Sequence, residues 1–321
     1  MSDAQQTDKA AHWTGDHVVH ISDKPMPTIP LINATDIRRL LPDHDFWDSW
    51  PLQDRDGRAV DFDGTTLWMM LSSRVLPDPA ARHGEARIRL IAQTGDDWAD
   101  CGDVLPDHLA PGTREWAGSA ILDDDGQTVT LYFTATGRHG APLSFEQRLF
   151  KTSGTLRRDA RKIEGWTVPT EIVASDGHHY VDTRVHQGVP GMIKGFRDPG
   201  YFRDPADSGD YLVFTGSDGR DPGNVNGVVG LIRRDASGWM LQPPIFSALG
   251  LCNELERPHI LFFGGLYYLF WSTQRHVFAP DGQWTQWPLW CCIRPFAWPL
   301  SPAQRHWTGR GKSRQRADAG L

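Results

Sequence analysis

Short runs of apolar residues, separated by turn-forming residues, recur along most of the chain. Seven of these runs are rich in β-branched and aromatic residues, and clusters such as DDDGQ and FFGGL lie between them. The pattern predicts strands at residues 64–73, 85–93, 116–122, 127–137, 210–217, 226–234 and 266–272. It predicts one short helix, at residues 34–43. Many short strands indicate an all-β fold, and the length of 321 residues favours a propeller over a single sandwich.

The pattern changes abruptly at residue 283. The residues from 283 to 321 hold five of the 14 tryptophans and two of the four cysteines, and strand alternation stops there. Net charge is +5 in this tail and −12 in residues 1–282. A composition shift of this kind marks a boundary between two parts of a chain. We therefore divide the chain into a domain at residues 1–282 and an aberrant tail at residues 283–321.

The overall composition disfavours several classes of partner. A hydrophobic content of 39% and a charged content of 23% are typical of a soluble globular protein. The net charge of −7 disfavours a nucleic-acid partner. No run approaches the roughly 18 apolar residues of a membrane span, and residues 1–21 do not read as a classical signal peptide. The four cysteines lack the spacing of a zinc site or of a disulfide framework.

The first candidate for chemistry is the stretch FWDSWPLQDRDG, in which Asp48 lies between two tryptophans. Aromatic walls exclude water and pack on the apolar face of a sugar, while a carboxylate supplies a reactive oxygen. The same local pattern is also typical of an aspartate that starts a turn between two core tryptophans. The stretch GFRDPGYF is similar, because Arg197 and Asp198 form either a sugar-binding pair or an ordinary ion pair at a turn.

The third candidate is the stretch LCNELERPHI. In a regular strand Glu254 and Glu256 would point to one face, with Arg257 and His259 on the other, and a bend at Pro258 would change this. Two neighbouring carboxylates repel each other, and this raises the proton affinity of at least one, as a general acid requires. The alternative is a charged face of an edge strand in solvent.

Taken together and in this order, WDSWPLQ, EWAGSA, FRDP and ELERPH resemble the bacterial levansucrase and inulosucrase family, glycoside hydrolase family 68. The resemblance runs from about Trp13 to Gly282. It implies an all-β, five-bladed β-propeller, incomplete in its last blade if the tail is aberrant. It also implies cleavage of sucrose with retention of configuration, through a covalent fructosyl-enzyme, and transfer of fructose to a fructan or to water.

The resemblance assigns three catalytic carboxylates. Asp48 would be the nucleophile, Asp198 would bind fructose hydroxyls and stabilise the transition state, and Glu256 would be the acid/base. Retaining chemistry requires the nucleophile and the acid/base to lie about 5–5.5 Å apart. Residues 48 and 256 are therefore expected to converge at the axis of the propeller, which the inner strands of the blades line.

The resemblance also implies a set of sugar-binding residues, with three departures from the family pattern. The expected set is Trp47, Trp116, Arg197, Glu254, Arg257, Gln274 and Arg275. Ala117 stands where the family often has serine, and Gln274 where an arginine or histidine often governs transfer, a role that Arg275 or His276 could take. Some members hold a structural calcium ion with an aspartate at the position of Asn253, so we expect no cofactor and disfavour calcium.

The tail has a second interpretation in the light of this resemblance. Permissible codons for QWTQWPLWCC, read one nucleotide later, give Ser-Gly-Pro-Asn-Gly-Leu-Tyr-Gly, which is similar to the family at this point. We therefore interpret residues 283–321 as translated out of frame, in which case the encoded activity and the activity of this chain are separate questions. A hydrolase-dominant β-fructofuranosidase and a non-catalytic sugar-binding propeller stay open as alternatives. We expect a monomer that binds sucrose and fructan acceptors, and place it outside the cell or, alternatively, in the cytoplasm.

Overall fold

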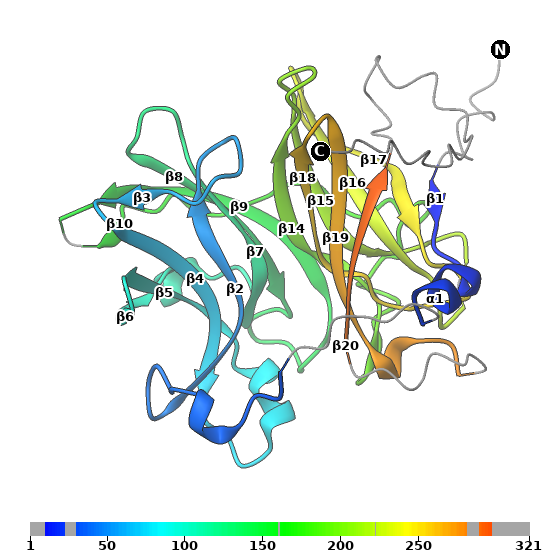
Figure 1. Ribbon diagram of the computed structural model, residues 1–321, viewed down its shortest axis with the longest axis horizontal. Coiled ribbons are helices and arrows are strands. Elements are labelled where there is room, and N and C mark those ends of the chain that lie inside the picture. The colour runs from blue at the N-terminus through cyan, green and yellow to red at the C-terminus, as the bar shows by residue number, and fades with distance from the viewer. Residues whose placement is uncertain (1–9, 23–29, 160, 222, 281–288, 297–321) are drawn as a thin grey trace, which may run out of the picture.

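Strands that follow one another along the chain pair with each other, so the sheets are mostly antiparallel meanders (Figure 1). The structure, a computed structural model, describes residues 10–22, 30–159, 161–221, 223–280 and 289–296. The first group of strands is β2 (His44–Gln53), β4 (Thr65–Arg74), β5 (Arg87–Thr94) and β6 (Asp97–Asp103), with β3 (Asp61–Phe62) beside β4. The second is β7 (Arg114–Leu122), β8 (Thr128–Thr136), β9 (Gln147–Arg157) and β10 (Lys162–Glu164), with β11 (Thr170–Glu171) beside β9.

Two further groups complete the described sheets. The third group is β14 (Phe196–Arg203), β15 (Asp210–Ser217), β16 (Gly227–Asp235) and β17 (Gly238–Ser247), to which β1 (Ala11–His12) adds in parallel. The fourth is β18 (Glu256–Phe263), β19 (Leu266–Gln274) and β20 (Leu289–Phe296). A small hairpin of β12 (Gly188–Val189) and β13 (Met192–Ile193) precedes β14.

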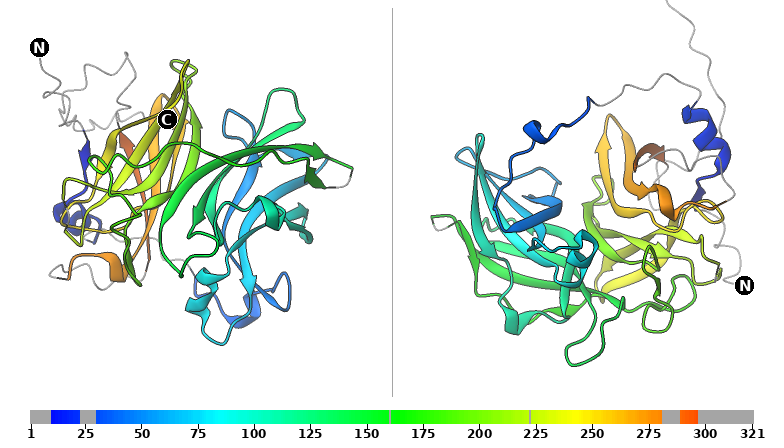
Figure 2. Two further views of the ribbon diagram at one scale, coloured as in Figure 1. Left: turned by 180° about the vertical axis from the view of Figure 1, so that it is seen from behind. Right: turned by 90° about the horizontal axis from the view of Figure 1, so that it is seen from below.

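The four groups are blades of a β-propeller, which confirms the predicted all-β propeller fold. They follow one another around the molecule in chain order, from blue β2 to orange β19 (Figure 2, right). The first strands of the blades, β2, β7, β14 and β18, contact one another in that order and form the inner wall. The expected fifth blade and its incompleteness concern residues outside the described ones.

The hydrophobic core lies between neighbouring blades, in three clusters of buried side chains. One cluster packs the first blade on the second, for example through Met69 and Phe133. A second packs the second blade on the third, and a third packs the third blade on the fourth, where Trp13 meets Trp271 with ring centroids 5.4 Å apart. The blades pack closely against their neighbours through these clusters. Residues that are far apart in sequence are therefore held at fixed positions near the axis.

All seven predicted strands are present, but the predicted helix is wrong. Residues 34–43 contain only the 3-10 helix η2 (Ala34–Asp36), whereas α1 (Gly15–Ser22) was not predicted. The other 3-10 helices are η3 (Pro79–Gly84), η4 (Asp107–Leu109) and η5 (Arg275–Val277). Beyond residue 282 the structure describes only β20, which pairs with β19 and so extends the strand pattern into the tail. None of the described helices is long and apolar enough to cross a membrane.

Candidate active site

Each of the four inner strands carries one extra residue relative to its partner strand. The breaks in pairing register lie between Trp47 and Ser49, Trp116 and Gly118, Arg197 and Gly200, and Glu256 and His259. Neighbouring side chains of a regular strand point to opposite faces, whereas a bulge changes the direction of the chain. As a result, two consecutive residues of each strand line one central cavity: Trp47–Asp48, Trp116–Ala117, Arg197–Asp198 and Glu256–Arg257.

Three of the bulge residues have left-handed backbone conformations. The φ angles are +49° at Asp48, +60° at Asp198 and +50° at Arg257. This region costs an L-residue about 1–2 kcal/mol, and aspartate tolerates it better than most because its short side chain bonds to nearby groups. Strained backbone of this kind persists only where the surrounding structure holds it, and it concentrates at functional sites.

Buried hydroxyl groups hold the bulges of neighbouring blades together. Thr134 Oγ1 donates to Ala117 O (3.1 Å) and accepts from the backbone N of Asp198 (2.8 Å). Thr215 Oγ1 accepts from the backbone N of Arg257 (3.1 Å) and lies 3.0 Å from Asp198 Oδ2 and 3.1 Å from Leu255 O. Its single proton serves one of these two acceptors at a time. The polar backbone groups that the bulges release are therefore partnered by threonines of β8 and β15.

The central cavity has a volume of about 380 Å³ and contains the predicted catalytic residues Asp48, Asp198 and Glu256 in its lining. Of the predicted sugar-binding residues, six line it: Trp47, Trp116, Arg197, Glu254, Arg257 and Gln274. Arg275 does not. Its side chain is exposed at the start of η5, and His276 lines the cavity instead.

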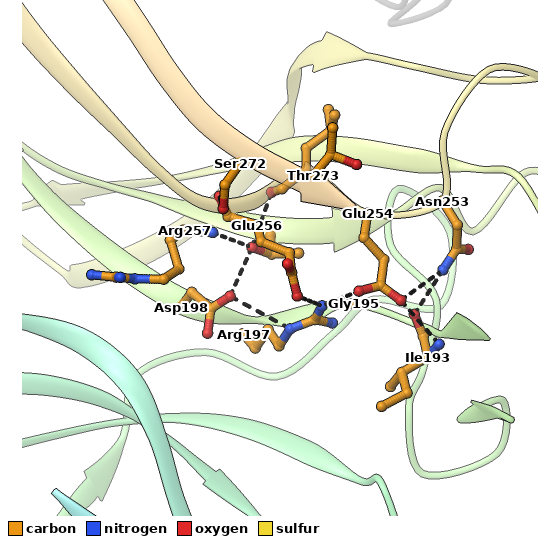
Figure 3. Close-up of polar contacts among 12 residues, drawn as sticks. Ile193, Gly195, Arg197, Asp198, Asn253, Glu254, Glu256, Arg257, Ser272 and Thr273 are labelled. Atoms are coloured by element: carbon orange, nitrogen blue, oxygen red, sulfur yellow. Dashed lines mark hydrogen bonds and ion pairs between the residues drawn. The ribbon is translucent and has the colours of Figure 1, made fainter. Parts of the chain in front are cut away.

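A single buried guanidinium connects the carboxylates (Figure 3). Arg197 Nη2 donates to Glu254 Oε2 (2.7 Å) and to Glu256 Oε1 (3.0 Å), and Nε lies 3.4 Å from Asp198 Oδ2. The side chain of Arg197 is only 5% exposed, so these interactions take place away from bulk water. Acids from two blades are thus brought to one point, although 56 and 58 residues separate Asp198 from Glu254 and Glu256 along the chain.

The strand is not regular at Arg257, so the orientation expected for a regular strand does not apply, and Arg257 lines the cavity as its predicted sugar-binding role requires. Its side chain does not point away from Glu256, because the extra residue and the left-handed φ at Arg257 turn it into the same cavity. Arg257 Nη2 donates to Ser49 O (2.7 Å), and Nη1 lies 3.4 Å from Asp48 Oδ1. Arg257 therefore joins the fourth blade to the first across the axis.

Burial and mutual repulsion raise the pKa values of the acids. Burial raises the pKa of Asp198 to about 6, with Arg197 opposing and the charges of Asp48 and Glu256 adding to the rise. Burial likewise raises the pKa of Glu254, against the effect of Arg197. The pKa of Asp48 is raised by burial, while Arg257 lowers it and Glu256 raises it. The charge of Glu256 thus contributes to the raised pKa of Asp48, and the expected separation of their oxygens stays a prediction.

Several donors that border the cavity lack a protein partner. The indole Nε1 atoms of Trp47 and Trp116 and the Nη1 atom of Arg197 are buried without a hydrogen-bond partner among the described residues. These three atoms have almost no exposed surface, so a ligand in the cavity would reach them only if the side chains turned. What the cavity offers a polyhydroxylated ligand is its tryptophan walls and the carboxylates and guanidinium groups between them.

Other lining residues were not predicted from the sequence. His83 packs edge-on against Trp47 with centroids 5.7 Å apart, and burial lowers its pKa. Arg82 lies over the same indole ring at 4.9 Å, so η3 holds one wall of the cavity. The remaining lining residues are Leu71, Phe145, Pro190, Gly191 and Ile193. No local pattern distinguishes them from ordinary loop and core residues.

This fold and this cluster of carboxylates agree with comparisons to known proteins. The sequence model of the Levansucrase/Invertase family, glycoside hydrolase family 68, matches residues 1–229 and 224–284. The chain therefore belongs to that family.

The similar proteins are levansucrases and an inulosucrase. The chain is 29% identical over 323 residues to a levansucrase of Erwinia amylovora, covering 85% of this chain and 75% of that protein. It is 28% identical over 319 residues to a levansucrase of Rahnella aquatilis, covering 84% and 74%. The solved inulosucrase from Halalkalicoccus jeotgali bound to kestose superimposes with a TM-score of 0.75 at 32% identity, covering 89% of this chain and 73% of that one. Levansucrase of Bacillus subtilis, at 20% identity and a TM-score of 0.73, shares the fold.

Proposed function

We propose that the protein is a sucrose-cleaving fructosyltransferase that works through a covalent fructosyl-enzyme. The observation that carries this proposal is the convergence of Asp48, Asp198 and Glu256 on one cavity whose walls are tryptophan and arginine. Two carboxylates are the minimum for retaining glycoside chemistry, and a third suits the stabilisation of a positively charged sugar ring.

In this proposal Asp48 is the nucleophile. Its carboxylate attacks the anomeric carbon of the fructosyl unit while the bond from that carbon to the glucosyl oxygen breaks. Arg257, 3.4 Å from Asp48 Oδ1, holds the carboxylate in place and favours its ionised form. Glu256 gives its proton to the departing glucosyl oxygen, so that glucose leaves as a neutral molecule.

The second half of the reaction reverses these roles. Glu256 takes a proton from water or from a sugar hydroxyl, the oxygen attacks the anomeric carbon, and the carboxylate of Asp48 is released. Asp198 lies beside both steps and, when ionised, stabilises the positive charge on the fructosyl ring. Glu254, held by Arg197, is placed to bind hydroxyls of the glucosyl unit.

The test is incubation with sucrose of this chain and of a version with the reading frame restored from codon 283, with glucose, free fructose and fructan measured separately. We expect the frame-restored version to release glucose, with fructose divided between water and sugar acceptors. Loss of glucose release in Glu256→Gln is expected together with rescue for substrates whose leaving group needs no proton. An Asp48→Ala variant with unchanged glucose release would contradict the mechanism.

A separate proposal concerns the tail. We propose that residues 283–321 are translated out of frame, which is supported by the composition shift at residue 283 and by the end of the family match at residue 284. Sequencing the gene across codon 283 tests this. If the codons there do not encode the Ser-Gly-Pro-Asn-Gly-Leu-Tyr-Gly segment in the next frame, the idea fails.

A further inference from the structure

A buried ammonium group lies beside the cavity, with three oxygen ligands. Lys194 follows β13 and is 7% exposed. Its Nζ donates to Asn226 Oδ1 (2.6 Å), Gly223 O (2.8 Å) and Asn253 Oδ1 (3.0 Å). An ammonium has three protons, so all of them are used. Two of the ligands are amide oxygens of residues that are 0% and 1% exposed, Asn226 and Asn253 respectively.

Both amide groups are fixed in this orientation by their own N–H bonds. Asn226 Nδ2 donates to Asp218 O (2.9 Å) and Asp221 O (2.6 Å). Asn253 Nδ2 donates to Ile193 O (2.9 Å) and to Glu254 Oε1 (3.2 Å). The oxygens of the two amides are consequently turned toward Lys194. Uncharged oxygens that converge on one point are the ligands that a hard cation prefers.

The calcium ion that the family resemblance implies does not fit here. The position that would carry a metal-binding carboxylate is Asn253, and its amide oxygen already faces the Lys194 ammonium. A divalent ion at the same oxygens would lie within a few ångströms of a positive charge, and like charges that close repel strongly in a buried site. Burial lowers the pKa of Lys194, while Asp221 and Glu254 act in the opposite direction.

We propose that the Lys194 ammonium is an internal cation that replaces a bound metal ion and thereby positions Glu254. It joins three segments: the end of the β12–β13 hairpin, the loop of Gly223 and Asn226, and Asn253 just before β18.

Two of these three segments also hold Glu254. Glu254 Oε1 accepts from the backbone N of Ile193 (3.1 Å), the residue before Lys194, and from Nδ2 of Asn253. The other oxygen, Oε2, accepts from Arg197 (2.7 Å). Lys194 touches no cavity atom that would react, so it acts through the two donors that orient Glu254. It is a positioning residue.

Two variants of the full chain and one control test the proposal. Lys194→Met removes the ammonium group but keeps an unbranched side chain that is one atom shorter. We expect its Tm to fall by about 5 °C or more, because buried amide oxygens lose their partner. Lys162→Met, which changes an exposed lysine of β10, should leave Tm unchanged. Neither EDTA nor millimolar calcium should change the Tm of the parent chain.

The second variant creates the metal site that the parent lacks. In Lys194→Ala combined with Asn253→Asp, the ammonium is gone and a carboxylate is gained, so calcium should raise Tm in a saturable way. This arm stays informative if Lys194→Met does not fold. A parent chain whose Tm depends on calcium, or a double variant that does not respond to calcium, overturns the proposal.

The effect on Glu254 rests on the proposed function and is measured separately. For Lys194→Met we expect the KM for sucrose to rise at least about tenfold while kcat changes less than about threefold, because substrate contacts are lost and the reacting acids are not. An unchanged KM contradicts the positioning role. A frame-restored chain that does not cleave sucrose would contradict the proposed function, but the Tm results with calcium would still decide whether Lys194 replaces a metal.

Discussion

Strands β14 and β15 lie side by side in one sheet, yet they are built differently. β15 pairs with β16 without a break from Tyr211 to Ser217, and every residue of β15 is buried. β14 breaks its pairing between Arg197 and Gly200 and has a left-handed residue at Asp198. The side chains of the regular strand β15 are packed in the interior, whereas the irregular strand β14 bears the reactive groups. The difference shows that strain in this fold is placed where two neighbouring side chains must face the same cavity.

The regular strand also supports the irregular one. Thr215 of β15 partners the bulges of both β14 and β18, and Thr134 of β8 does the same for β7 and β14. Gly200 lets β14 approach β18, since a Cβ there would lie 2.5 Å from Pro258 O. The geometry of the site is therefore set by contacts between blades, not by any one strand.

The largest effect is expected at Asp48, whose backbone is left-handed. A substitution that preserves this conformation tests the chemical role of the carboxylate alone. Asp48→Asn keeps a residue that tolerates positive φ but removes the nucleophile, so kcat for sucrose cleavage should fall about 10⁴-fold or more. The matched control is Asp63→Asn, at φ +55° in the exposed turn between β3 and β4, which should leave kcat unchanged. Steady-state glucose release from both variants measures this, and similar kcat values for the two would contradict the role of Asp48.

Removing the support of the bulges should have the next largest effect. Thr215→Val deletes the hydroxyl that partners two bulges, so the free energy of unfolding should fall by about 2–3 kcal/mol and kcat by about tenfold or more. Thr152→Val in β9 is the control, because Thr152 donates to Thr167 O (2.6 Å) far from any bulge. It should cost about 1 kcal/mol with kcat preserved. Chemical denaturation and kinetics on the same samples distinguish the two variants. A Thr215→Val chain with the kcat of the parent would show that the bulges keep their geometry without the Thr215 hydroxyl.

The third prediction concerns the buried charge of Asp198. Its folded-state pKa of about 6 lies above the ordinary value of 3.8, so the folded state binds the proton more tightly. The stability that this proton contributes is present below pH 3.8 and is lost as pH rises through about 6. Asp198→Asn, which also tolerates positive φ, should therefore stabilise the fold over the parent by about 1 kcal/mol more at pH 8 than at pH 5.

Thermal melts of both chains at the two pH values measure this difference, with Asp63→Asn as the exposed control. The same substitution should abolish sucrose cleavage, because an amide carries no charge to stabilise the fructosyl ring. A variant that is less stable than the parent at pH 8 would mean that the ion pair with Arg197 outweighs the cost of burying the carboxylate.

The smallest predicted effect adds a contact at the bulge of β7. Ala117 lines the cavity beside Trp116, and Ala117→Ser places a hydroxyl there, so the KM for sucrose should fall about two- to tenfold with little change in kcat. Ala120→Ser, on the same strand but in the core, should instead lower Tm and leave KM unchanged. Equal effects of the two variants on KM would contradict a direct contact at residue 117.

Strands with an intact period of two were the easiest to predict. The predicted strand at 210–217 has the same bounds as β15, and the other predicted strands differ from the observed ones by at most two residues at either end. Of the inner strands, β7 was predicted despite its bulge, whereas β2 and β14 were not, because a bulge interrupts alternation after only a few residues. The outer strands β6, β9 and β17 were also missed. The one local clue is proline: Pro199 and Pro258 each follow a bulge residue, where a strand can do without an N–H donor.

The candidate acids and their convergence at the axis were both expected from the family resemblance, and local sequence patterns alone indicated neither. Local patterns fitted a turn at Asp48 better than an active site, and a solvent-exposed strand at Glu256 as well as an active site, since nothing nearby encodes contacts between blades. For the same reason His83 and Lys194 could not be recognised: a lone histidine in a short helix and a lone lysine in a hairpin carry no signal until their partners are known.

Each inner strand differs from its regular partner by a single inserted residue. Four such insertions separate this catalytic funnel from a propeller whose central strands present every second side chain. Exchange of side chains on a regular sheet cannot reproduce the arrangement, because the two members of each pair would face opposite ways. A designer who wishes to transplant the site would have to copy these changes in length first, and in evolution the same step is a three-nucleotide insertion, not a point mutation.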